Sequence, residues 1–126
     1  MDNQGTGGKI YDIRDRSFAF SVRIVNLCKI LHKNAEVGHL VTNQLLAAGT
    51  SVGANLEEAR AGQSSRDFLH KNSIALKEAR ESRYWLRLIK ATADFTPSVL
   101  QEVTELADEA QELANIIGKI IVNTRG

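Results

Sequence analysis

The apolar residues near the end of the chain recur at alternating spacings of four and three, and this feature constrains the fold most strongly. The repeat consists of Val99, Val103, Leu106, Ala110, Leu113, Ile117 and Ile120. Such spacing places every member on one face of an α-helix. Thr96 and Pro97 precede the repeat, and proline is favoured at a first helical position because no amide hydrogen is needed there. We therefore predict a helix over residues 97–122.

Three further helices are predicted upstream, over residues 13–33, 37–61 and 65–93. Asp12 or Asp15 is suited to cap the first, and Gly62, Gln63 and Ser64 separate the second from the third. The connections are short, and a short turn returns the chain along the helix it has just left. We therefore expect an all-α fold, an antiparallel, up-down-up-down four-helix bundle over residues 10–123, preceded by a flexible tail over residues 1–9.

Composition places this bundle among soluble single-domain proteins. The 126 residues are 43% hydrophobic and 25% charged, an ordinary balance for a globular chain. No apolar run approaches the roughly 18 to 20 residues that cross a bilayer, and the N-terminus lacks a signal-peptide pattern, so we expect a cytoplasmic protein without a membrane partner. The single cysteine, Cys28, excludes an intrachain disulfide. A small core side chain is a simpler interpretation of Cys28 than a nucleophile paired with His32.

Two carboxylate–histidine pairs suggest a metal site. Glu36 with His39 and Asp67 with His70 each place a carboxylate and an imidazole one helical turn apart, as in di-iron bundles. The pairs open two consecutive helices, however, and a helix of about 25 residues separates them by roughly 38 Å. We therefore predict no metal, no cofactor, no small-molecule substrate and no enzymatic activity.

The stretch SVGANLEEA, residues 51–59, places small and polar residues inside the second predicted helix. Gly53 costs about 1 kcal/mol of helix propensity relative to alanine, so a packing role is expected. In an antiparallel hairpin this region lies opposite alanines and serines of the third helix. We predict that these small residues let the second and third helices approach closely, and that Asn55 and Glu58 fix their register through hydrogen bonds near the turn.

Three segments resemble one protein family, in the same order along the chain. They are YDIRDRSFAF, QLLAAGTSVGANLEEA and SSRDFLHKNSIALKEARESRYWLRLI, and the resemblance covers about residues 10–92. They are similar to the bacterial four-helix bundle proteins of the 23S rRNA intervening-sequence family, which is related to the accessory proteins of diversity-generating retroelement reverse transcriptases. The family motif falls on Ser51, Asn55, Glu58, Glu78 and Glu81.

This resemblance implies a left-handed bundle that assembles into a ring-like homopentamer, with no established enzymatic activity. It also implies association with nucleic acid, because some relatives are encoded within ribosomal RNA genes and others present a basic surface to nucleic acid. We therefore expect a homo-oligomeric scaffold whose partner is RNA or a nucleic-acid enzyme. The alternative is a protein–protein adaptor, or an accessory subunit of a reverse transcriptase, without autonomous RNA binding.

Two charged stripes bear on this choice. Basic residues recur in the third helix, at Arg80, Arg83, Arg87 and Lys90. Acidic residues recur in the fourth helix, at Glu102, Glu105, Glu109 and Glu112. In one arrangement the stripes neutralise each other, with Arg87 level with Glu102. In the other, the basic stripe forms a surface for phosphate groups with three arginines of the first helix, Arg14, Arg16 and Arg23. A net charge of +1 favours neutralisation, since nucleic-acid-binding domains are usually strongly basic.

Apolar residues lie on two opposite sides of the first helix, and one side alone can face the core. One stripe is Phe18, Val22 and Val25. The other is Phe20, Ile24, Leu27 and Leu31. We assign the second stripe to a subunit interface, because exposed apolar patches of this size mark protein contacts. The third helix is expected to contribute Ile74, Trp85 and Leu88. Homo-oligomerisation is therefore predicted from the residues as well as from the resemblance.

Overall fold

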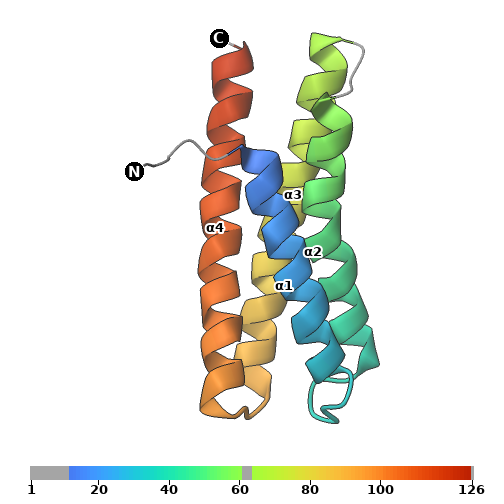
Figure 1. The fold of residues 1–126 in the computed structure, drawn as a ribbon, viewed down its shortest axis with the longest axis vertical. Helices are drawn as coiled ribbons and strands as arrows, with labels where there is room; N and C mark the ends of the chain where they lie inside the picture. Colours follow the sequence, from blue (N-terminus) through green and yellow to red (C-terminus); the bar gives the residue numbers. More distant parts are fainter. Residues whose placement is uncertain (1–11, 61–63, 126) are drawn as a thin grey trace.

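The computed structural model describes residues 12–60 and 64–125, which form four α-helices and their connections (Figure 1). They are α1 (Ile13–Leu31), α2 (His39–Arg60), α3 (Ser65–Thr92) and α4 (Pro97–Arg125). Each helix packs against its neighbours in the sequence, and α1 also packs against α4. Within the described residues no helix contact crosses a diagonal of the bundle. The predicted all-α, up-down-up-down four-helix bundle is confirmed.

The helices begin where side chains can satisfy the free amides of a first turn. An Asp12 carboxylate oxygen accepts a 2.9 Å hydrogen bond from the amide of Arg14, and the Ser64 hydroxyl accepts one of 3.1 Å from the amide of Asp67. α2 begins at His39, two residues later than predicted, because Gly38 has a φ of +81° and lies outside the helical region. The predicted tail over residues 1–9 lies outside the described residues.

One apolar face of each helix forms the core. On α4 the predicted repeat points inward, and five of its members are completely buried: Val103, Leu106, Ala110, Leu113 and Ile117. Buried polar side chains are satisfied within their own helices, as in Ser82, whose hydroxyl donates to the carbonyl of Glu78 at 2.8 Å. The core is therefore mainly aliphatic, with the Phe20 ring among its members, and its stability comes mainly from apolar area removed from water.

The side of α1 that faces the core differs from the prediction. Phe20, Ile24, Leu27 and Leu31 are at most 2% exposed in the single chain, so their assignment to a subunit interface is wrong. The opposite stripe is at the surface, where Phe18 is 70% and Val22 is 44% exposed. The buried stripe spans about three turns, from residue 20 to the end of α1, whereas the other spans about two turns. The longer apolar stripe is the one that packs on the core.

Close packing through glycine occurs between α1 and α2, whereas the sequence suggested α2 and α3. A Cβ added at Gly49 would lie 2.7 Å from a methyl carbon of Ile24, and the Ser21 hydroxyl donates to the Gly49 carbonyl at 3.2 Å. Gly53 also faces α1, where an added Cβ would meet the Ser17 and Ser21 hydroxyls at 3.4 Å. The helix backbones approach each other at Gly49, while Gly53 leaves room for a methyl group.

Across residues 12–60 and 64–125, none of the helices combines the length and the apolar character that crossing a bilayer would take.

Candidate nucleic-acid interface

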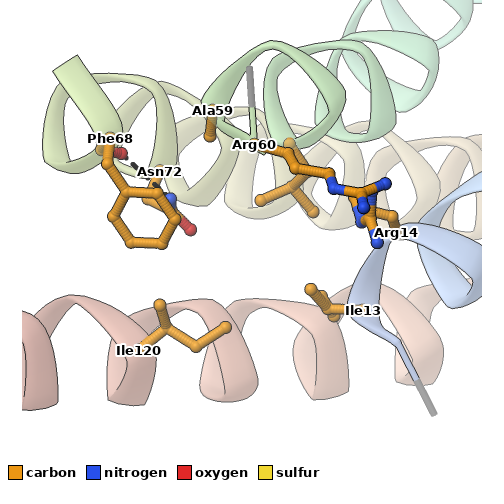
Figure 2. A pocket seen from close by; sticks show the side chains of 8 residues that line it. Ile13, Arg14, Ala59, Arg60, Phe68, Asn72 and Ile120 are labelled. Atoms are coloured by element: carbon orange, nitrogen blue, oxygen red, sulfur yellow. Dashed lines mark hydrogen bonds between the residues drawn. The ribbon is translucent and has the colours of Figure 1, made fainter. Parts of the chain in front are cut away.

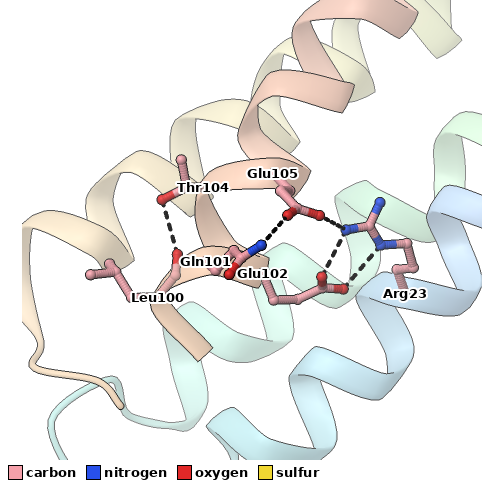
Figure 3. Close-up of polar contacts among 6 residues, drawn as sticks. All are labelled: Arg23, Leu100, Gln101, Glu102, Thr104 and Glu105. Atoms are coloured by element: carbon pink, nitrogen blue, oxygen red, sulfur yellow. Dashed lines mark hydrogen bonds and ion pairs between the residues drawn. The ribbon is translucent and has the colours of Figure 1, made fainter. Parts of the chain in front are cut away.

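The acidic stripe of α4 is paired with arginines of α1. Arg23 donates to both carboxylate oxygens of Glu102, at 3.0 and 2.7 Å, and to Glu105 at 2.9 Å (Figure 3). One turn further along α4, Arg16 binds both carboxylate oxygens of Glu109, at 2.7 and 2.8 Å. Two-pronged arginine–carboxylate contacts of this kind are the stronger class of ion pair. Four carboxylates of α4, including Glu112 at 3.5 Å from Arg16, are therefore engaged by one neighbouring helix.

The predicted neutralisation of the α4 stripe by α3 is wrong. Arg87 was matched with Glu102 because the two residues lie at the same height along an antiparallel helix pair. The glutamates, however, lie on the flank of α4 that faces α1. The rotation of a helix about its own axis decides which neighbour a flank meets, and register does not contain that information. The hydrogen bonds that Arg23 donates to Glu102 raise the pKa of the Arg23 guanidinium.

The first-helix arginines are thus occupied. Arg14 pairs with Asp12 through two guanidinium nitrogens, and this pairing lowers the pKa of the Asp12 carboxyl. Arg16 and Arg23 are held by α4. A phosphate would have to displace a carboxylate to reach any of the three, so the structure does not bring them together with the α3 stripe as one open surface.

The four basic residues of the predicted α3 stripe are open by comparison. Arg80, Arg87 and Lys90 are exposed, and Arg83 is half-buried beside them. Within the described part of the chain, these four side chains form no ion pair. A phosphate group can therefore approach them without competing with a carboxylate.

Sequence reasoning missed two members of this surface. The outermost line of α3 runs through Lys77, Arg80, Tyr84 and Arg87, at spacings of three and four. Lys77 is exposed, and Tyr84 is 55% exposed. We call these four residues the outer face of α3. They were missed because the stripe was drawn through Arg83, which lies on the flank; a helical repeat centred opposite Ala75 and Ala79 would have found them.

The motif residues lie along α2 and α3, and most of their bonds stay within one helix. The Ser51 hydroxyl donates to the carbonyl of Ala47 at 2.7 Å, and the Asn55 amide donates to the Ser51 carbonyl at 2.8 Å. Glu58 does cross to α3, where it accepts a 2.7 Å hydrogen bond from Lys71. The predicted cross-helix hydrogen bond is therefore present for Glu58, and the Asn55 bond lies within α2.

The motif glutamates of α3 have different surroundings. Glu81 accepts a 3.2 Å hydrogen bond from the indole nitrogen of Trp85. Glu78 is half-buried, and this burial, with the nearby charge of Glu81, raises the pKa of the Glu78 carboxyl. Beside them Ile74, Trp85 and Leu88 are each half-buried. This α2–α3 flank keeps apolar surface available for a partner.

Sites for other chemistry are sparse. A recess of about 170 Å³ lies between α2, α3 and α4 at the end where α1 begins (Figure 2). Its walls are mainly apolar, with Arg14 and Arg60 together at one edge and Asn72 bonded to the Phe68 carbonyl at 2.9 Å. Among the described residues no group of three histidine, cysteine or acidic side chains is placed to hold a metal. Cys28 is buried, and burial raises the pKa of its thiol to about 11, as expected for a core side chain.

Comparisons with known proteins agree with the fold and confirm the family resemblance of the sequence. The family described as 23S rRNA-intervening sequence protein matches residues 9–118. Among solved structures, the chain is similar to a protein of unknown function from the S23 ribosomal protein family of Bacteroides thetaiotaomicron. The two are 38% identical with a TM-score of 0.79, over 87% of this chain and 98% of the other. No curated protein matches.

Proposed function

Because the chain belongs to the 23S rRNA-intervening sequence protein family, we propose that it is a non-enzymatic, homo-oligomeric scaffold that binds RNA through the outer face of α3. One observation carries the proposal. The α4 carboxylates are paired with α1, and within the described residues no carboxylate pairs with the basic residues that follow Lys71 on α3, which are Lys77, Arg80, Arg83, Arg87 and Lys90. The near-neutral total of +1 thus conceals a locally basic helix, and a local charge suffices to attract phosphate.

RNA retention at two salt concentrations tests this proposal. The variant Arg80→Ala/Arg87→Ala removes two charges from the outer face, and Lys119→Ala/Arg125→Ala removes two exposed charges from α4 as a matched control. With a structured RNA, we expect the parent to bind at low salt and to lose affinity steeply as salt rises. Each lost phosphate contact lowers the salt slope by roughly 0.7 to 0.9. Equal binding by the two double variants would refute the assignment to α3.

The assembly part of the proposal rests on two separate apolar surfaces. One lies on α1, at Phe18 and Val22, and the other on the α2–α3 flank, at Ile74, Trp85 and Leu88. When two different surfaces of one subunit meet, the contact is heterologous and repeats from copy to copy until it closes as a ring. We propose that the α1 surface of one copy meets the α2–α3 flank of the next. The resemblance supports five subunits.

Mixing two interface variants tests this geometry. Phe18→Glu and Leu88→Glu each spoil one of the two surfaces, and Val122→Glu, at an exposed apolar site on α4, is the control. The parent, a 13.9 kDa chain, is expected at about 70 kDa by light scattering, and each single variant as a monomer. A mixture of the two variants is expected to give a heterodimer, because one intact contact remains. A parent that is monomeric at high concentration would overturn the proposal.

The competing function is a protein–protein adaptor, or an accessory subunit of a reverse transcriptase, without RNA binding of its own. The exposure of Phe18, at 70%, favours it, since large exposed apolar side chains mark protein contacts. A parent protein that assembles normally but retains no RNA at low salt would favour this function over the RNA scaffold.

A further inference from the structure

The outer face of α3 places an exposed aromatic ring among cations. Tyr84 is 55% exposed, and it lies one helical turn from Arg80 and one from Arg87. Lys77 continues the basic line, and the exposed Lys90 lies beside it. A single exposed apolar residue is ordinary. An aromatic ring between two arginines that form no ion pair within residues 12–60 and 64–125 is suited to bind a partner that is both aromatic and anionic.

Trp85 supports this ring from the side. The centroids of the Tyr84 and Trp85 rings are 5.2 Å apart, and their planes meet at 76°, an edge-to-face contact. Trp85 packs against the core, and its indole nitrogen is held by Glu81 at 3.2 Å. The position of the tyrosine ring is therefore defined by a neighbour that is itself fixed, while more than half of the residue faces solvent.

The spacing of the flanking cations suits one strand of nucleic acid. Arg80 and Arg87 are separated by about 10.5 Å along the helix axis, and Tyr84 lies between them. A base stacked on the tyrosine would leave the phosphates on either side within reach of the guanidinium groups. Proteins that hold single strands combine these two contacts. In a duplex the bases stack on each other, so a ring on a straight helix finds no free base face.

We propose that Tyr84 is a base-stacking residue and that the outer face of α3 binds single-stranded in preference to duplex nucleic acid. The inference rests on the proposed function, because it names the kind of nucleic acid that the same face binds. It adds a contact that charge alone would not provide.

Direct binding of a short oligouridine strand and of its duplex with oligoadenosine tests the inference. The variants are Tyr84→Leu, which keeps an apolar side chain, and Tyr84→Phe, which keeps the ring. Trp85 is the single tryptophan, so its fluorescence reports events at Tyr84. We expect the parent to prefer the single strand and the titration to change Trp85 emission. Tyr84→Leu should weaken single-strand binding roughly 5- to 150-fold without changing the salt slope, and Tyr84→Phe should restore it.

The outcomes separate the two proposals. If Arg80→Ala/Arg87→Ala weakens binding while Tyr84→Leu matches the parent, or if the duplex binds as well as the single strand, the RNA scaffold stands and the stacking inference is overturned. If the parent binds neither strand at low salt, both are overturned. Tyr84 is exposed, so unchanged helicity by circular dichroism serves as the check that each variant folds.

Discussion

At the scale of single residues, two glycines of one helix have different roles. Gly49 faces Ile24, whose side chain is completely buried and has nowhere to move. Gly53 faces two serine hydroxyls at ordinary contact distance. The residue that attracted attention in the sequence, Gly53, is therefore less constrained than its neighbour four positions earlier.

Alanine at these two positions should change stability in opposite directions. We expect Gly49→Ala to lower the free energy of unfolding by roughly 1–2 kcal/mol, because overpacking against Ile24 exceeds the gain in helix propensity. We expect Gly53→Ala to raise it by up to about 1 kcal/mol, the propensity gain alone. Urea denaturation of both variants measures the pair, and two changes of the same sign would contradict this account.

Glu78 gives stability a dependence on pH. Its pKa is raised by burial above the ordinary 4.5, so between the two values the folded chain keeps a proton that the unfolded chain has lost. The contribution of Glu78 to the free energy of unfolding therefore falls as pH rises through this window and is constant above it. Glu78→Gln should melt at a higher temperature than the parent at pH 7, with the gap closing as pH falls toward about 4. Asp108→Asn, at an exposed residue of α4, is the control. An equal rise in melting temperature for this variant would show that burial of Glu78 is not the cause.

At the scale of elements, ion pairs line the contact between α1 and α4. These two helices have the least extensive contact of the four adjacent pairs, and the Arg16 and Arg23 contacts lie along it. The side chains are partly exposed, from 22% for Glu109 to 62% for Glu112, so salt can screen them. The attachment of α1 is expected to vary with ionic strength more than that of any other helix.

Removing Arg23 tests this attachment. Arg23→Ala should lower the free energy of unfolding by roughly 0.5–1 kcal/mol at low salt, and the difference from the parent should shrink as salt is added. Arg125→Ala, at an exposed cation near the end of α4, is the matched control. If the loss in free energy of unfolding were the same at high salt, the cause would be lost packing of the arginine's aliphatic stem and not the lost charge.

The periodicity of apolar residues was sufficient to predict the four helices. It could not predict how each helix is rotated about its own axis. Four helices, their order and the inward face of α4 follow from apolar spacing and capping residues such as Asp12. On α1 both sides carry apolar residues, so spacing alone could not say that Phe20 is buried and Phe18 exposed. For the same reason the partner of the α4 glutamates was misassigned. The rotation of each helix depends on all neighbours packing at once, including the approach at Gly49, and such contacts are not encoded within one segment.

At the scale of the whole molecule, three different surfaces are available on one small bundle. The outer face of α3 is basic, while α1 and the α2–α3 flank each have an apolar patch. If the apolar patches join copies, each added subunit places another basic face on the same assembly. Several weak contacts to one RNA then act together, which raises overall affinity without any new contact.

Assembly should make thermal stability depend on protein concentration. Binding between folded copies stabilises the folded state by mass action, so the parent should melt at higher temperature as concentration rises. Phe18→Glu should abolish this dependence on concentration. Its melting temperature should equal that of the parent at the lowest concentrations. The measurement is a series of calorimetric or fluorescence melts across a wide range of concentrations. A melting temperature of the parent that does not vary would contradict assembly through folded copies.

The mode of attachment of α1 also has a kinetic consequence. The contact between α1 and α4 is the least extensive of the four, and its ion pairs are partly exposed. We therefore expect α1 to open while the other three helices stay packed, because local opening costs less than global unfolding. Amide hydrogens of α1 should therefore exchange with deuterium faster than those of α3 and α4, and faster still at high salt. Each such opening would uncover the apolar stripe that begins at Phe20, and this transient state is the one in which two copies could trade their first helices.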